Sequence, residues 1–295
     1  MAKIDIPTKR LIQIRPMDWV RVILPECDEV EITEMRPDKV PRTESKLDAL
    51  FWIRSNNEQF ILNIEPQGYL DPAMPARMLR YRSDVWEYTI SKGVATPSIK
   101  QVVIFFYPQH DNKKNYLEDT WQERKTLAFE YEVIKVWEMD RDPVLQKKLL
   151  GLYPLLPLME RGPGETPDQA IEAAVNIIQT VEEEALKADL LAVMSILAGE
   201  RFSSKLVRKY VRREMLMKST LFKEWVEEER EEIGISKTRE NIIELLTEKF
   251  DFVPSAMKGQ LAQVNDQVVL DSLLRKIIRV ERLEDFGASL EYVVR

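Results

Sequence analysis

The sequence predicts an α/β protein in which helices flank a mixed β-sheet and an all-helical region follows. Three observations lead to this prediction. Two strand-like segments, residues 47–54 and 58–65, flank a short polar turn. The nearly continuous apolar run at residues 99–107 is typical of a strand that is covered on both faces. Beyond residue 161, apolar residues recur with the period of about 3.6 residues that marks helices.

The turn between the first two strands sets how they pair. Asparagine tolerates positive φ, so Asn56 and Asn57 are suited to a two-residue hairpin turn. Such a turn places Ser55 opposite Glu58, and the strands then pair outward residue by residue. The register of the whole hairpin therefore follows from the turn.

Counting outward from this turn, Asp48 lies across from Glu65, and Lys46 lies across from Gln67. Glu65 and Gln67 are two residues apart and therefore share a face. Two opposed carboxylates repel each other, which destabilises the hairpin unless a cation lies between them. Hard divalent cations such as Mg²⁺ prefer oxygen ligands of this kind. The alternative is that Asp48 and Glu65 are solvent-facing residues of a half-exposed hairpin.

Further elements complete the predicted sheet. Residues 30–35 alternate in polarity and indicate a strand before the hairpin. A helix is expected from Pro72 to about Lys92, because Asp71 suits its N-cap and Gly93 its end. Residues 126–139 alternate over a long span and predict one more strand.

A cluster of Gly and Pro at residues 161–167 marks the clearest change of pattern in the chain. It predicts one domain over residues 1–160 and a helical one over residues 161–295. Within the second, residues 168–198 are expected to be helical, and Ser203 or Ser204 to cap a helix that runs to Ile233. Gly234 would interrupt it, and four shorter helices would follow at residues 236–250, 254–264, 266–280 and 283–294.

The helix expected after Ser203 carries an uneven charge pattern. Its first part is basic, from Lys205 to Arg213, and residues 227–232 are mostly acidic. That order opposes the helix macrodipole at both ends, so packing would have to stabilise such a helix. The basic run, with Tyr210 inside it, would suit a phosphate backbone, but it also fits a solvated helix face.

Composition narrows the classes of function. The chain has 295 residues, 44% of them hydrophobic and 32% charged, as in globular proteins. No apolar run is long enough for a membrane span, and the N-terminus lacks the apolar core of a signal peptide, so we expect a cytoplasmic protein. One cysteine rules out an internal disulfide, and His110 is the single histidine, expected in a surface loop. The net charge of −7 weighs mildly against non-specific binding to nucleic acid.

The order of these motifs resembles the PD-(D/E)xK nuclease superfamily, in which an Asp on one strand precedes a Glu-x-Lys at the end of the next and then a helix. The matching residues are Asp48 and Glu65-Pro66-Gln67. The chain is more similar to the Rpn branch of recombination-promoting, transposase-like nucleases. That branch has Glu-x-Gln and a following Arg-x-x-x-Tyr helix, here Arg77 and Tyr81. The similarity covers residues 10–160, including segments 131–139 and 152–158, and more loosely the C-terminal helices.

The resemblance implies a site that binds Mg²⁺ or Mn²⁺ through Asp48, Glu65 and the carbonyl of Pro66. Gln67 would take the position of the family's lysine, where it can orient a water molecule but cannot act as a base. Lys46 would then supply the missing ammonium group, or it would simply offset the two acids.

The resemblance also implies roles for the helix that follows. Arg77 and Tyr81 are expected near the site, with Arg77 contacting DNA or orienting Glu65 through an ion pair. Arg80 would contact the DNA backbone or be a solvated residue. The expected activity is metal-dependent endonucleolytic cleavage of DNA in recombination, mobile-element or defence processes. The alternative is an inactive scaffold that retains the nuclease fold. In either case we expect a homodimer formed through the helical region.

Overall fold

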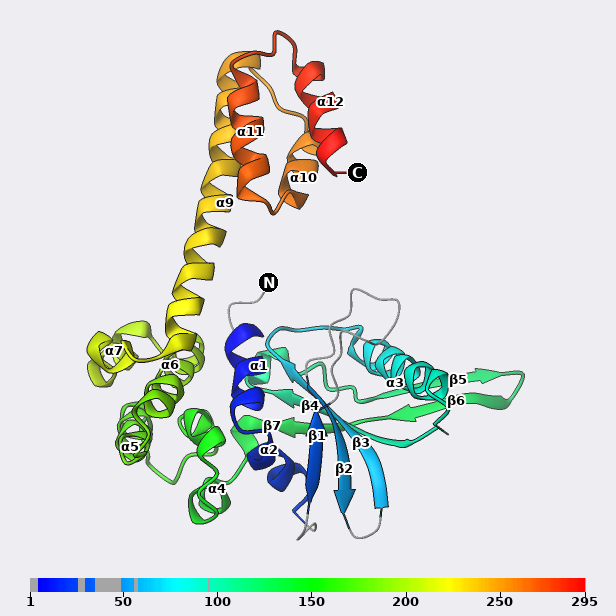
Figure 1. Ribbon diagram of the computed structural model, residues 1–295, viewed down its shortest axis with the longest axis vertical. Helices are drawn as coiled ribbons and strands as arrows, with labels where there is room; N and C mark the ends of the chain where they lie inside the picture. Colours follow the sequence, from blue (N-terminus) through cyan, green and yellow to red (C-terminus); the bar gives the residue numbers. More distant parts are fainter. Residues whose placement is uncertain (1–4, 26–29, 35–48, 56–57, 95, 295) are drawn as a thin grey trace. The chain divides into compact units, whose positions relative to one another are not determined.

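The computed structural model describes residues 5–25, 30–34, 49–55, 58–94 and 96–294 (Figure 1). Its contacts divide the chain into two compact units, unit 1 over Met1–Phe222 and unit 2 over Lys223–Arg295. Among the described residues, none of the helices is long and apolar enough to cross a membrane.

Unit 1 contains a five-stranded mixed sheet in the order β1-β2-β3-β4-β7. β1 pairs antiparallel with β2, and β2 antiparallel with β3, whereas β3, β4 and β7 run parallel to one another. The α/β class and the mixed sheet are therefore as the sequence predicts. The strands are β1 (Glu31–Glu34), β2 (Ala49–Ser55), β3 (Glu58–Gln67), β4 (Ser98–Phe105) and β7 (Glu132–Lys135).

The hairpin of β2 and β3 has the predicted register over all the residues that the structure describes. Ser55 pairs with Glu58 and Ala49 pairs with Ile64. The turn residues Asn56 and Asn57 lie outside the described residues. The polarity pattern and the number of turn residues were therefore sufficient to fix the pairing.

The long strand expected over residues 126–139 is divided in the structure. Its first part, β6 (Arg124–Glu130), pairs with β5 (Tyr116–Trp121) in a separate two-stranded sheet. Its second part is β7, followed by a short 3-10 helix over Val136–Glu138. The division falls at Tyr131, whose backbone N–H donates to Asn115 O (3.1 Å) and whose hydroxyl donates to Lys114 O (2.8 Å). The backbone bond to Asn115 takes the place of a ladder bond in a continuous strand, and the hydroxyl bond adds a second contact with the same loop.

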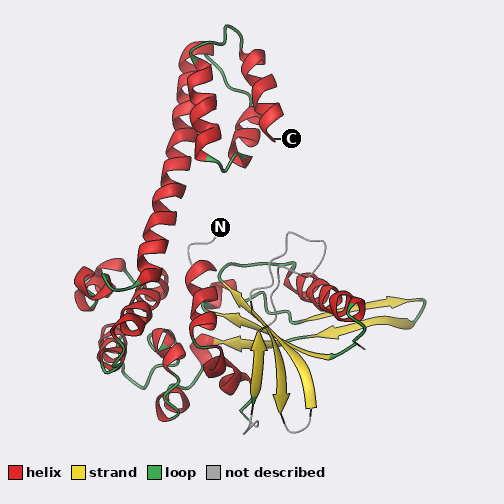
Figure 2. Ribbon diagram, viewed as in Figure 1, coloured by secondary structure: helices red, strands yellow, loops and turns green. Residues whose placement is uncertain are grey.

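Helices cover both faces of the five-stranded sheet (Figure 2). On one face lies α3 (Met74–Ser91), which begins and ends within two residues of the predicted bounds. Its buried side chains form one apolar cluster with Ile61, Val103 and Phe105 of the sheet. On the other face, α1 (Asp5–Ile14) packs against β2 and β3. Behind α1 lie the 3-10 helix η4 (Leu150–Leu155) and α6 (Glu184–Arg201). α2 (Pro16–Ile23) and α4 (Asp142–Gln146) complete this layer by packing against η4.

The Gly/Pro cluster at residues 161–167 is a loop within unit 1, so the boundary found between Phe222 and Lys223 differs from the one expected at residue 160. α5 (Pro167–Gln179) follows this loop and begins with a capping box formed by Thr166 and Gln169. α5 and α6 both pack against η4, which connects these two helices to the helical layer on the sheet.

The prediction of one helix from Ser203 or Ser204 to Ile233 is wrong. Three helices occupy this stretch, namely α7 (Ser204–Tyr210), α8 (Arg213–Leu216) and α9 (Thr220–Phe250). Ser203 does cap α7, because its side chain accepts from the N–H of Leu206. Gly234 lies inside α9 and does not interrupt it.

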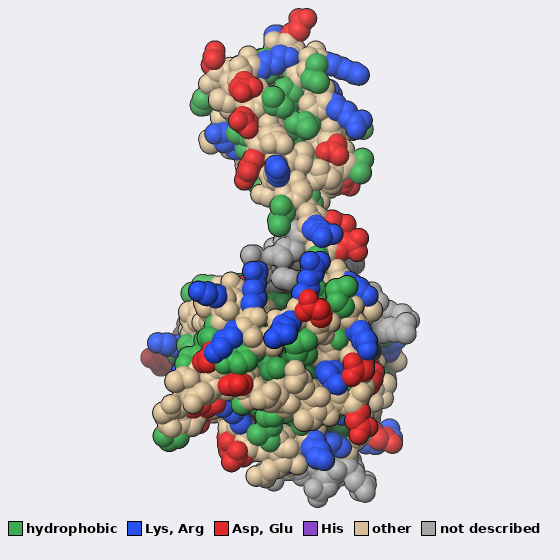
Figure 3. All heavy atoms as spheres, turned by 90° about the vertical axis from the view of Figure 1, so that its left-hand side faces the viewer, with side chains coloured by type: hydrophobic (Ala, Val, Ile, Leu, Met, Phe, Trp, Pro, Cys, Tyr) green, Lys and Arg blue, Asp and Glu red, His purple; other side chains and the backbone are tan. Residues whose placement is uncertain are grey.

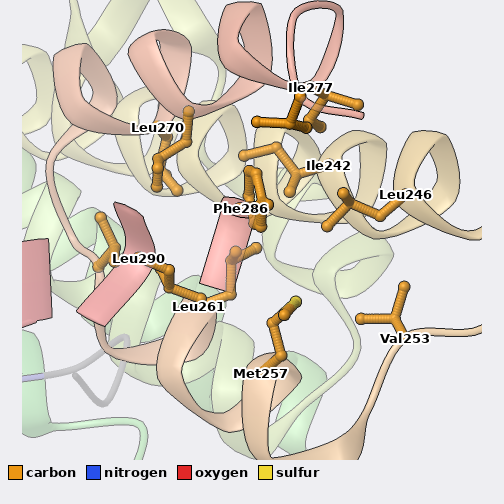
Figure 4. Close-up of a cluster of buried hydrophobic side chains, with 12 residues drawn as sticks. Ile242, Leu246, Val253, Met257, Leu261, Leu270, Ile277, Phe286 and Leu290 are labelled. Carbon is orange, nitrogen blue, oxygen red and sulfur yellow. The ribbon is translucent and has the colours of Figure 1, made fainter. Parts of the chain in front are cut away.

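Unit 2 consists of most of α9 together with α10 (Ser255–Gln263), α11 (Gln267–Ile277) and α12 (Leu283–Val294). The helices after Pro254 match the expected bounds within three residues. The unit has its own buried core, in which Phe286 of α12 lies beside Ile242 of α9, and Leu290 of α12 lies near Leu261 of α10 (Figure 4). It therefore buries apolar surface without residues from unit 1.

Candidate functional site

The candidate site lies at the edge of the sheet where the parallel strands β3, β4 and β7 end (Figure 1). Gln67 is in register with Phe105, and Phe105 with Lys135. Since residues in register on neighbouring strands share a face, these three side chains and Glu65 lie on the side covered by α3. In α/β sheets, ligands commonly bind just beyond the carboxyl ends of parallel strands.

Glu65 and Gln67 are both buried, with 4% and 1% of their surface exposed. Burial of a carboxylate is costly unless a cation and hydrogen bonds compensate. Glu65 is compensated by an ion pair between its Oε1 and Nη2 of Arg77 (3.1 Å). Gln67 bonds through both ends of its amide group, because Nε2 donates to Tyr69 O and Oε1 accepts from Arg77 Nη2 (2.6 Å).

Arg77 is the central contact of the site. Besides Glu65 and Gln67, its guanidinium reaches Asp71 Oδ2 (3.1 Å) and donates to the Tyr69 hydroxyl (2.8 Å). Burial alone would lower the pKa of Arg77, but the charge of Glu65 and the contacts with Tyr81 and Tyr69 together outweigh burial, and the pKa is raised. The planar, five-donor guanidinium suits such a position, because it can bind several acceptors at once.

A second group of polar side chains continues the site from β3 toward β7. Lys135 at the end of β7 pairs with Asp111 Oδ2 (3.1 Å), and this bond raises the pKa of Lys135. Asn112 Nδ2 donates to Asp71 O (3.2 Å), which joins this group to the contacts of Arg77. Burial raises the pKa of the neighbouring Tyr131 phenol to about 12, so it is neutral at physiological pH.

Sequence reasoning did not identify Asp71, Asp111 or Lys135 as site residues. The sequence marks Asp71 only as the start of a helix, and Asp71 does accept from the N–H of Ala73 (2.8 Å). The available signal was position, because Lys135 ends β7 and Asp111 follows β4, and both strands proved to be parallel to β3. Recognising it required knowing the strand order, which the local pattern does not contain.

The predicted site residues have different outcomes. Glu65, Gln67 and Arg77 lie together, and the ion pair expected between Arg77 and Glu65 is present. Asp48 and Lys46 lie outside the described residues, so their predicted positions stay predictions. Pro66 lies between the two buried polar residues in β3.

The two remaining predicted residues are on α3. Tyr81 is 4% exposed and belongs to the apolar cluster between α3 and the sheet. Arg80 is exposed, and its guanidinium lies over the Tyr81 ring, 5.7 Å from the centroid. Tyr81 therefore supports the helix that carries Arg77, and Arg80 is accessible to solvent.

The donors available for a metal ion are oxygens. Glu65 supplies a carboxylate and Pro66 a backbone carbonyl, and hard divalent cations prefer both. The part of the chain that the structure describes holds no group of three or more His, Cys, Asp or Glu placed to bind a metal. The donor chemistry thus fits Mg²⁺, and a complete ligand set requires a further acid such as Asp48.

Compared with known proteins, the chain matches no family model, and no curated protein or solved structure shows significant similarity to it. The resemblance to PD-(D/E)xK nucleases therefore rests on the motifs quoted above.

Proposed function

We propose that this chain is a metal-dependent endonuclease of the PD-(D/E)xK type that hydrolyses DNA phosphodiester bonds in the cytoplasm. The observation that carries the proposal is the position of Glu65, held by Arg77 at the carboxyl end of β3. The hairpin register supports it. Ala49 pairs with Ile64, and the next residues along the chain are Asp48 and Glu65. A hairpin that keeps this register for one more pair would bring two carboxylates face to face.

In this proposal, Asp48, Glu65 and the Pro66 carbonyl hold Mg²⁺ or Mn²⁺. The ion would supply Lewis acidity at the phosphate and lower the pKa of a bound water. Arg77 fixes the side chain of Glu65 through its ion pair. Gln67 has neither charge nor basicity, and its amide already bonds Arg77 and Tyr69, so Lys46 is proposed as the ammonium group near the reacting phosphate.

The alternative function is that of a scaffold which keeps the nuclease fold without its activity and assembles as a homodimer through its helices. Two observations favour it. Arg77 forms ion pairs with both Glu65 and Asp71, so a cation is already present among these acids. Gln67 stands where the family has a lysine. This reading expects no cleavage by wild type and a dimer in light scattering.

The test is plasmid cleavage with Mg²⁺ or Mn²⁺ by wild type and by Asp48→Ala, Glu65→Ala and Glu65→Gln. Glu65→Gln keeps the shape of the side chain and guards against unfolding of the buried site. We expect losses of at least about a hundredfold, because even outer-shell partners of metal ligands account for 10- to 100-fold. Glu87→Ala, which removes an exposed carboxylate of α3, is the matched control and should cleave like wild type.

Equal residual cleavage by wild type and all three site variants would indicate a contaminating nuclease and overturn the proposal. Lys46→Ala separates the two roles considered for that residue. Loss of cleavage with unchanged stability supports a part in the reaction, and unchanged cleavage discards it.

A further inference from the structure

The region with the greatest local excess of positive charge is residues 204–218, which form α7 and α8. It contains six basic residues and one acidic residue in a chain whose net charge is −7. A helix face that only interacts with water usually mixes both signs, because Glu and Lys four residues apart stabilise each other. One acid among fifteen residues departs from that pattern.

Most of these cations are not neutralised by neighbours. Lys209 pairs with Asp168 (2.8 Å) and Lys218 with Glu184 (3.3 Å). The other four basic residues are all exposed, and none of them forms an ion pair with a carboxylate of the described residues. They are Lys205, Arg208, Arg212 and Arg213. Figure 3 views unit 1 from the side of α5 and α7 and shows Lys and Arg side chains gathered there.

The fold holds this surface in place. Asp168, at the start of α5, accepts from Lys209 Nζ and from the Tyr210 hydroxyl (2.7 Å) and so anchors the end of α7. Between α5 and the α7–α8 segment lies a groove of about 580 Å³, lined by Lys209, Tyr210 and Arg212 together with Asn176 and Gln179 of α5, and two carboxylates, Glu172 and Glu214, lie at the same groove. Cations, an aromatic ring and amides are the side chains that contact phosphates and sugars in nucleic-acid complexes.

The basic surface is connected to the edge of the sheet that carries the candidate site. The Tyr107 hydroxyl, two residues beyond β4, donates to Leu197 O of α6 (2.8 Å). α6 ends at Arg201, close enough to Tyr107 that its charge acts on the pKa of that phenol, and α7 begins at Ser204. One hydrogen bond and one short connection therefore lead from the end of β4 to α7.

We propose that the basic surface of α7 and α8 binds the phosphate backbone of duplex DNA. The choice of nucleic acid rests on the proposed nuclease function, whereas the binding itself does not require catalysis. The four unpaired cations would each displace a condensed counterion from the duplex, so binding weakens steeply with salt. This contact holds the substrate beside the sheet edge and offsets the repulsion from an acidic protein.

The test measures binding of the full-length protein to a fluorescein-labelled DNA duplex by anisotropy, in EDTA so that no cleavage occurs. The test variant is Lys205→Gln/Arg208→Gln/Arg212→Gln. The matched control is Arg21→Gln/Arg124→Gln/Lys147→Gln, which removes three exposed charges from scattered positions of unit 1. A third variant, Lys205→Arg/Arg208→Lys/Arg212→Lys, alters all three test positions but keeps their charge.

Three lost phosphate contacts should flatten the slope of log K against log salt by about 2.7, and weaken binding about 10- to 100-fold at low salt. The control and the charge-conserving variant should bind like wild type. The proposal is overturned if the test variant also does so, if the control weakens equally, or if wild type does not bind. Binding only to phosphatidylserine vesicles or to an acidic protein such as prothymosin, and not to DNA, overturns it as well.

The two proposals fail in different ways. If the plasmid stays uncut but α7-dependent binding is present, the nuclease proposal fails and this one holds. If Glu65-dependent cleavage occurs while binding is independent of α7, the reverse applies.

Discussion

A single side chain, Arg77, holds together the described part of the candidate site. It contacts Glu65, Gln67, Asp71 and the Tyr69 hydroxyl within 3.1 Å. We expect Arg77→Met to lower the free energy of unfolding by about 3 kcal/mol, because removing one partner of a buried ion pair is strongly destabilising. Arg77→Lys should lose less, since it keeps the charge but not the fork of donors.

Urea denaturation at neutral pH measures this effect. Arg80→Met is the matched control on the same helix, because Arg80 is exposed and should change stability by no more than about 0.5 kcal/mol. Equal losses for Met at both positions would show that Arg77 contributes as an ordinary surface residue.

His110 permits a direct pH measurement, because it is the one histidine of the chain. Burial lowers its pKa, and its ring meets the Tyr107 ring edge-on at 5.4 Å. A lowered pKa means that the unfolded chain binds the proton more readily than the folded one. The stability contributed by neutral His110 is thus full above pH 6.5 or so and falls as the pH drops through its folded pKa. NMR titration of its ring protons should give a pKa below about 6.5, and a higher value would contradict this expectation.

At the scale of elements, the sequence was most informative where the signal is local. The β2–β3 pairing follows from a two-residue turn, and α3 ends where Gly93 adopts a φ of +75° that suits glycine. The contact between Asp111 and Lys135 was not predictable in this way. It depends on β7 lying parallel to β4, which brings together residues far apart in the chain.

The break between α7 and α9 shows the opposite case, in which tertiary contacts override a continuous helical pattern. Val211 is extended and buried, and the bonds of Asp168 to Lys209 and Tyr210 hold α7 against α5. The break also removes the expected conflict with the macrodipole. Arg208 and Lys209 now lie in the last turn of α7, where positive charge is favourable.

At the scale of the whole molecule, the chain consists of two units with separate cores. The twelve buried residues of the second core lie between Ile242 and Leu290, all beyond the boundary after Phe222. Because unit 2 has a core of its own, we expect it to unfold separately from unit 1. The tryptophans make the two events distinguishable, because five of the six belong to unit 1 and only Trp225 to unit 2.

Phe286 is fully buried in the second core, and Phe286→Ala should destabilise unit 2 by about 3–5 kcal/mol. In thermal unfolding, the helical circular-dichroism signal of this variant should decline earlier than in wild type, while tryptophan fluorescence stays almost unchanged. Met78→Ala is the matched change in unit 1, where Met78 is buried between α3 and the sheet, and it should shift the fluorescence transition. If both probes shifted together in both variants, the two cores would unfold as one cooperative structure, and α9 would couple them instead of merely connecting them.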